Sequence, residues 1–224
     1  MKTTLLIITA ATLLVTHVRA ALTVTSGDFE DGLTDQQLDV TGWFESSTSG
    51  FVDWINLSTS IQNDPGNGYV QSRHLAMRGD GYVYQSLGFY QSSAGTMANW
   101  EAYQGVFADS NASAGFTIAF YAGAFPGAGE GVDIATAGLS LIGSVTSLSA
   151  LGNPASLASA GYRSGSIDLS SLAENTEIWT VVRGTGGAGA YAPLDSFTVT
   201  QVPEPCSMLL GLMGAAGLLV RKRR

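Results

Sequence analysis

The amino-acid sequence predicts an all-β protein, a β-sandwich of the jelly-roll type, with an N-terminal signal helix and a short C-terminal transmembrane helix at its two ends. Three observations point to this fold class. Short runs of alternating apolar and polar residues recur between residues 22 and 202, turn sequences separate them, and no convincing amphipathic helix lies in that range. The 224 residues include 28 glycines and are 45% hydrophobic, which suits one sizeable core joined by many turns.

Six runs have the composition and alternation of β-strands. The clearest follows Gly115, because Phe116, Ile118 and Phe120 would share one face of a strand. Residues 122–160 are rich in Gly, Ala and Ser and form either a long loop or weak strands. The six runs are Leu22–Thr25, Phe51–Leu57, Tyr82–Leu87, Gly115–Tyr121, Glu177–Val182 and Leu194–Thr200.

Charge and reactive side chains exclude several classes of function. The net charge is −8, and between residues 22 and 202 there are four arginines, no lysine and 17 acidic residues. Such a surface repels phosphate backbones, so we expect no nucleic-acid partner. The chain has one cysteine, Cys206, and two histidines, His17 and His74. This scarcity excludes internal disulfides, Cys-based zinc sites and most nucleophile–histidine pairs.

The two ends of the chain predict an export signal and an anchor. Residues 1–20 combine Lys2, an apolar stretch and small residues before a cut after Ala20, as a secretory signal peptide does. Residues 21–201 then form one β-sandwich domain. Residues 202–224 contain Pro203, Glu204 and Pro205, then the apolar run Met208–Val220, which predicts a short membrane helix that holds the protein in the membrane before processing.

Four basic residues, Arg221, Lys222, Arg223 and Arg224, close this segment. The order of Pro-Glu-Pro, a Gly/Leu-rich span and a basic terminus resembles the PEP-CTERM sorting signal of bacterial surface proteins. The resemblance implies that an exosortase, a membrane protease, recognises these residues and cuts near Pro-Glu-Pro. It also implies that the domain is displayed at the cell envelope, on the outer surface or outside the cell. The alternative is a plain tail anchor.

The body of the chain resembles carbohydrate-binding-module-like, galactose-binding-like jelly rolls. The resemblance rests on Val24–Glu30, on Gly42-Trp43, on Tyr84–Leu87 and on Leu194–Val199, although Ser26 stands where such domains commonly have Asn. It implies a structural calcium ion that joins the opening and closing segments. By position its ligands would be Glu30 and Asp195, with Asp28 next, and hard carboxylate oxygens suit calcium. The alternative is that these are solvated loop acids.

Aromatic residues raise the possibility of a sugar-stacking platform. Trp54 and Trp100 have the polar neighbours Asp53 and Asn99, so we expect them to be the exposed rings, with core packing as the alternative. The main interpretation is an exported, non-catalytic binding or structural protein of the surface or extracellular matrix, with polysaccharide as a further partner. One alternative is a carbohydrate-binding module with an aromatic platform. A weaker one is an extracellular glycoside hydrolase that uses carboxylate pairs such as Asp28/Glu30 or Glu174/Glu177.

Overall fold

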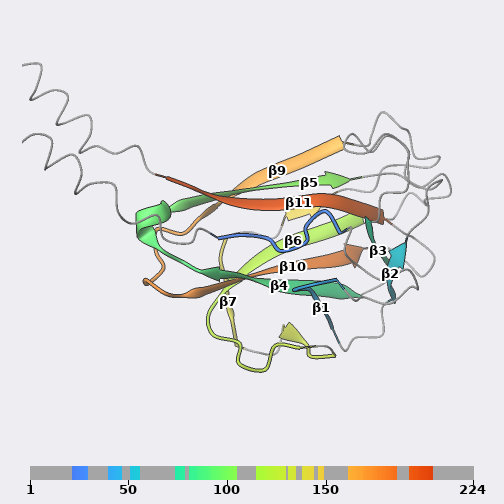
Figure 1. The fold of residues 1–224 in the computed structure, drawn as a ribbon, viewed down its shortest axis with the longest axis horizontal. Coiled ribbons are helices and arrows are strands. Elements are labelled where there is room, and N and C mark those ends of the chain that lie inside the picture. Colours follow the sequence, from blue (N-terminus) through green and yellow to red (C-terminus); the bar gives the residue numbers. More distant parts are fainter. Residues whose placement is uncertain are drawn as a thin grey trace, which may run out of the picture.

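Two antiparallel β-sheets stack face to face and confirm the predicted all-β, jelly-roll-type sandwich (Figure 1). The structure is a computed structural model, and it describes the positions of part of the chain. The described residues are 22–29, 40–46, 51–55, 74–78, 81–104, 115–129, 131–134, 138–143, 146–148, 161–185 and 192–203.

The lower layer in Figure 1, here called sheet A, has six strands in the order β1-β4-β10-β6-β7, with β8 paired to β6 beside β7. All its pairs are antiparallel. Its strands are β1 (Phe44–Glu45), β4 (Tyr82–Phe89), β6 (Gly115–Ala122), β7 (Ser140–Leu141), β8 (Thr146–Leu148) and β10 (Glu177–Thr185).

The other layer, here called sheet B, has five antiparallel strands in the order β2-β3-β11-β5-β9; in Figure 1, β9, β5 and β11 lie along the top and β3 and β2 at the right. From β3 to β6, and again from β8 to β11, each successive strand lies in the opposite sheet, which is the crossing pattern of a jelly roll. Its strands are β2 (Phe51–Ile55), β3 (His74–Arg78), β5 (Met97–Gln104), β9 (Gly161–Asp168) and β11 (Ala192–Val202), and the 3-10 turn η1 (Ser92–Ala94) precedes β5.

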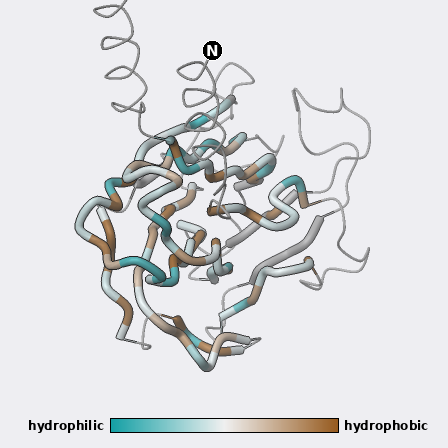
Figure 2. The backbone as a smooth tube through the Cα atoms, turned by 60° about the vertical axis from the view of Figure 1, so that its left-hand side comes forward, coloured by the Kyte–Doolittle hydropathy of each residue, from teal (hydrophilic) through white to brown (hydrophobic). Residues whose placement is uncertain are grey.

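The main core lies between the two sheets and follows from the two-residue period of the strands. On β6 the side chains of Phe116, Ile118 and Phe120 are buried, as the sequence predicts. Figure 2 shows brown apolar segments scattered among pale and teal ones, with no single long apolar stretch in the described strands. Each strand therefore gives one row of side chains to the core and another to the outer face of its sheet.

Residues 22–29, here called the N-terminal strap, close one side of the sandwich. Their start matches the predicted run Leu22–Thr25, but the strap has no regular strand structure. Its backbone instead bridges both sheets: the Thr23 N–H donates to Leu87 of β4 at 3.0 Å, and the Phe197 N–H of β11 donates to Gly27 at 2.8 Å. The strap thereby occupies edge positions that β1 and β3, paired with only the ends of β4 and β11, leave open.

A second, smaller core covers the outer face of sheet A. Phe125 and Ile134 pack there on Tyr84 and Trp179 of the sheet. The Tyr84 hydroxyl donates to the Gly129 carbonyl at 2.8 Å, and Trp179 Nε1 donates to the Gly123 carbonyl at 3.1 Å. The sequence predicts either a long loop or weak strands over residues 122–160. The described part of this segment contains both, because an irregular stretch covers sheet A and the short strands β7 and β8 follow it.

The signal segment 1–20 and residues 204–224 lie outside the described residues, so the signal and anchor helices stay predictions. Within the described ranges, no helix has both the length and the apolar character that crossing a membrane requires.

The contact between the strap and β11 leaves no room for a side chain at Gly27. A Cβ atom there would lie 1.9 Å from the Phe197 carbonyl oxygen. We expect Gly27→Ala to push the strap off β11 and lower the free energy of unfolding by about 1–3 kcal/mol, as overpacking does. Urea denaturation measures this loss.

Gly129→Ala is the matched control, because a Cβ at Gly129 meets nothing within 4 Å and its φ is not in the left-handed region. It should leave the stability within about 0.5 kcal/mol of the parent. Equal effects of the two substitutions would contradict the close approach of strap and strand.

Candidate functional site

The outer face of sheet B carries two rows of exposed polar side chains, one row beside the other. The strand pairing places Glu101 of β5 between Ser164 of β9 and Thr198 of β11. One step along the strands, Asn99 lies in the same way between Ser166 and Thr200. All six side chains are exposed, because they alternate with the residues that these strands bury in the core. These six residues are called the polar face below.

The polar face forms the walls of a shallow hollow of about 530 Å³. The six side chains supply four hydroxyls, one amide and one carboxylate, so the hollow offers both donors and acceptors of hydrogen bonds. Its lining also includes Trp100 and Gly165, which are neighbours in the pairing of β5 with β9. None of the residues that line this hollow is basic.

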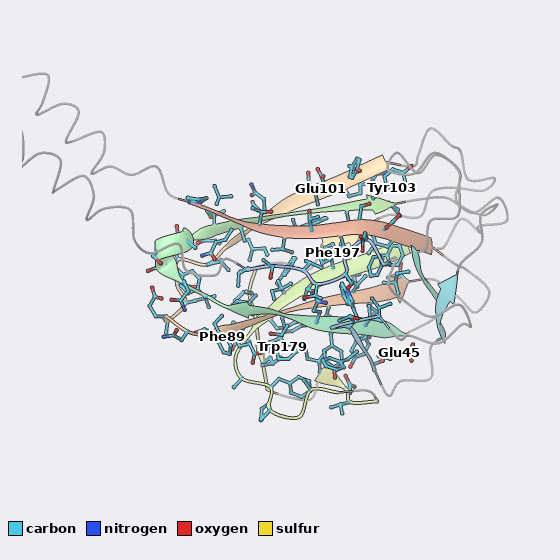
Figure 3. The ribbon with its side chains drawn as sticks, in the orientation of Figure 1. Glu45, Phe89, Glu101, Tyr103, Trp179 and Phe197 are labelled. Carbon is cyan, nitrogen blue, oxygen red and sulfur yellow. The ribbon has the colours of Figure 1, made fainter. Side chains whose placement is uncertain are left out.

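Two tyrosines lie at one end of the polar face. Tyr162 of β9 and Tyr103 of β5 are paired across the strands, with ring centroids 5.4 Å apart and ring planes at 70°. Tyr103 is buried, whereas Tyr162 is 48% exposed and presents part of its ring to solvent. Figure 3 shows Glu101 and Tyr103 together on β5 in the upper layer. An apolar ring surface therefore borders the rows of polar groups.

Trp100 does not form the exposed platform expected from the sequence, because its side chain is 3% exposed and belongs to the main core. A Cβ on Gly165 would lie 2.6 Å from Trp100 Nε1, so the indole ring packs directly on the Gly165 backbone. Asn99, the polar neighbour that favoured exposure, points to the opposite face of β5. A buried ring offers no surface for a sugar to stack on. The prediction that Trp100 is exposed is therefore wrong, and Trp100 is a core residue.

Trp54, the other tryptophan expected in a platform, lies in β2 opposite Leu75 of β3. Its side chain is outside what the structure describes.

The segments that carry the expected calcium ligands meet at a bulge in β11. The bulge lies between Asp195 and Thr198, and it is there that Phe197 bonds the strap residue Gly27. Asp195 is 3% exposed, and its Oδ1 accepts the Ser196 N–H at 2.6 Å, whereas Asp28 is exposed.

Glu30, the third expected ligand, lies outside the described residues. Among the described residues, no three His, Cys, Asp or Glu gather as a metal site. The two segments therefore meet as the calcium prediction requires, and the ligand set itself stays a prediction.

The remaining acidic residues of interest are held by serines. Glu174 accepts hydrogen bonds from the backbone N–H and the hydroxyl of Ser92, and Glu177 accepts one from Ser86 Oγ at 2.8 Å. At the end of β9, the hydroxyl and the backbone N–H of Ser170 hold the pKa of the exposed Asp168 below its ordinary value. Of the sorting residues, only Pro203 is described, and it is exposed; Glu204, Pro205 and Arg221–Arg224 are outside the description.

The polar face was not among the sites predicted from the sequence. A signal for it exists, because polar residues two positions apart occur in Asn99–Glu101, Ser164–Ser166 and Thr198–Thr200, the spacing of one strand face. The sequence does not say that these three pairs become neighbours, since that depends on which strands pair and in which register.

No protein-family model matches this sequence, and no curated protein matches it either. Among solved structures, it is similar to the CBM22-1 xylan-binding domain of Xyn10C from Paenibacillus barcinonensis, with a TM-score of 0.46 and 14% identity, over 83% of this chain and 97% of that one.

It is also similar to TmCBM61 in complex with β-1,4-galactotriose, with a TM-score of 0.44 and 12% identity, over 82% of this chain and 99% of the other. A third similar structure is the arabinose-bound MgGH51 α-L-arabinofuranosidase, with a TM-score of 0.49 and 10% identity, over 81% of this chain and 26% of that enzyme. The first two of these structures are carbohydrate-binding modules.

Proposed function

We propose that the β-sandwich binds a polysaccharide through the polar face of sheet B. The observation that carries this proposal is the pair of polar rows, Ser164–Glu101–Thr198 and Ser166–Asn99–Thr200, which line one open hollow. Sugar hydroxyls both donate and accept hydrogen bonds, so a site for them needs both kinds of group in convergent positions. Four hydroxyls, an amide and a carboxylate meet this need.

The charge and the aromatic border of the polar face define the ligand further. Glu101 is an acceptor that can hold two neighbouring sugar hydroxyls, and with no basic residue in the lining the hollow favours an uncharged glycan over an anionic one. The exposed part of the Tyr162 ring supplies a surface for the C–H side of a sugar ring. The proposal therefore adopts the alternative interpretation of the sequence, a carbohydrate-binding module. It differs in that a tyrosine at the border takes the place of the expected tryptophan platform.

We further propose that this domain is exported and sorted to the cell surface or the extracellular matrix. The support is the sequence: a signal-like segment at residues 1–20, and Pro203, Glu204 and Pro205 followed by an apolar run and four basic residues. An exosortase-type protease would act on this segment, and the acidic β-sandwich would stay outside as a non-catalytic binding or structural module.

Calcium at the junction of strap and β11 is the third part of the proposal, with Asp28, Glu30 and Asp195 as ligands. The contact between Gly27 and Phe197 supports it, since this contact brings the two ligand-bearing segments together. The place of Asp195 also supports it, because this buried carboxylate lies at the same bulge of β11, where its Oδ1 accepts the Ser196 N–H.

The glycan proposal is tested by affinity electrophoresis in gels that contain xylan or β-1,4-galactan. The wild type should be retarded in at least one of them. Glu101→Ala combined with Tyr162→Ala should weaken binding at least tenfold, which corresponds to about 1.4 kcal/mol, because it removes a central acceptor and the exposed ring.

Phe89→Ala is the control for this experiment, since Phe89 is 56% exposed but belongs to β4 of sheet A. It should migrate as the wild type does. Unchanged retardation of the double variant, with an unchanged melting temperature, would rule out the polar face as the binding site.

Removal of calcium tests the metal proposal. EGTA should lower the melting temperature, because an ion that binds only the folded state stabilises it, by about 2.7 kcal/mol at a hundred times its Kd. Asp195→Asn should abolish the effect of EGTA on the melting temperature. Asp168→Asn is the control and should keep that effect, because Asp168 is an exposed residue that accepts the Ser170 N–H and is not a proposed ligand. A melting temperature that EGTA leaves unmoved in the wild type would reject the site.

The intact mass of the mature protein from its native host tests export and sorting. We expect a mass that corresponds to a start at Ala21 and an end near Pro203–Pro205, because both processing steps would have occurred. A mass that retains Arg221–Arg224 would contradict processing at Pro-Glu-Pro and leave only a tail anchor.

A further inference from the structure

A second hollow, of about 440 Å³, lies between the N-terminal strap and β11. Thr23, Ser26 and Asp28 line it from the strap, and Ser196, Thr198 and Thr200 line it from β11. Five hydroxyls thus line this hollow, as four line the polar face, and again no basic residue is among the lining. Its one carboxylate belongs to Asp28, which the calcium proposal uses as a ligand.

The two hollows adjoin at β11. Thr198 and Thr200 line both hollows. The hollow of the polar face lies on the β5 side of these two threonines, and the second hollow lies on the strap side. The strap is a direct backbone neighbour of β11, as the hydrogen bond between Phe197 and Gly27 shows. From β9 through β5 and β11 to the strap there are three steps of about 4.8 Å, so the joint surface is about 14 Å long and crosses the strands.

The backbone around the second hollow is held in unusual conformations. Ser26, Phe29 and Ser196 all have positive φ, at 49°, 55° and 50°, although none is glycine. Such conformations cost free energy and persist where the surrounding structure enforces them, and bulges are frequent beside binding sites. Here the bulge in β11 and the bend of the strap at Ser26 both border the second hollow.

We propose that the two hollows form one track that takes an extended segment from within an uncharged polysaccharide chain, and that the strap supplies its second subsite. This inference rests on the function proposed above. A track about 14 Å long that is lined along its length by hydroxyls accommodates several consecutive sugar units, whereas a site for a terminal sugar needs one closed pocket. Affinity should therefore increase with ligand length until the second hollow is filled.

The test compares ligands of increasing length by isothermal titration calorimetry. The probes are β-1,4-linked xylo- and galacto-oligosaccharides from the disaccharide to the hexasaccharide. For the wild type, we expect the hexasaccharide of the preferred series to bind at least tenfold more tightly than its disaccharide. Equal affinity for all lengths would overturn the proposal.

Thr23→Arg is the informative variant, because Thr23 is exposed, lines only the second hollow and is not a calcium ligand in the proposal above. A long side chain there should remove the gain in affinity for the hexasaccharide and leave the disaccharide affinity unchanged. Thr25→Arg is the matched control, since Thr25 is also exposed in the strap but lies beside Gly42 and lines neither hollow.

The outcomes separate this proposal from the one on which it rests. If Thr23→Arg keeps the full gain with length, the second subsite is wrong while the polar face stands. Glu101→Ala should weaken the disaccharide and the hexasaccharide alike. If the wild type binds neither series at any length, the polar-face function and the track both fail.

Discussion

The side-chain amide of Gln85 takes the place of a strand partner for the backbone of the N-terminal strap. Its Nε2 donates to the Thr25 carbonyl and its Oε1 accepts the Thr25 N–H, both at 2.8 Å, while the side chain is 1% exposed. Trp43 Nε1 donates to the same carbonyl at 3.1 Å. Loss of this amide would remove the partner of the Thr25 N–H and leave Trp43 Nε1 as a donor to the Thr25 carbonyl. Each hydrogen bond lost in this way typically costs about 0.5–1.5 kcal/mol. The position of the strap therefore depends on one buried polar residue of β4.

Both the core and the candidate site depend on that position. The strap brings Phe29 onto Trp43, with ring centroids 5.5 Å apart, and Trp43 lies 6.0 Å from Phe197 of the β11 bulge. On its other side the strap becomes the wall of the second hollow. The buried rings and the exposed hydroxyls are thus positioned by the same short segment, which is why a change at Gly27 is expected to affect the stability of the whole sandwich.

Local alternation was sufficient to predict much of the fold, and pairing between distant strands was not. β2, β4, β6, β10 and β11 fall on predicted runs, because those runs are rich in aromatic and β-branched residues and turn sequences separate them. β9 was not predicted, since it is rich in Gly and Ser and its partner β5 supplies the apolar side chains. The same reasoning explains the candidate site. Asn99 and Glu101 reveal a polar strand face, but their neighbours come from residues 164–166 and 198–200, and only the register of the sheet brings these together.

The exposure of Trp100 was predicted wrongly for a different reason. A polar neighbour suggested that Trp100 was exposed, but in a strand the neighbour of an exposed residue points inward, so Asn99 argues for burial of Trp100. Once β5 is known to be a strand, the two-residue period decides between the platform and the core. The identity of β5 as a strand was the missing step, because the inward positions on either side of Trp100 are the small alanines Ala98 and Ala102, which give a weak apolar signal.

The outer face of sheet A is covered, whereas the polar face of sheet B is exposed, and this difference explains where a ligand is expected. Sheet A has an aromatic outer face, with Tyr84 and Trp179, and the segment after β6 covers it through hydrogen bonds from these two rings to Gly129 and Gly123. The described aromatic rings are therefore largely occupied by packing. The six outward residues of sheet B stay exposed and polar. Recognition on that face would depend mainly on hydrogen bonds, whose net contribution is modest for each pair but is lost when a sugar hydroxyl is missing or misplaced. A face of this kind distinguishes glycans by the pattern of their hydroxyls, and it needs several such contacts along a chain to bind firmly.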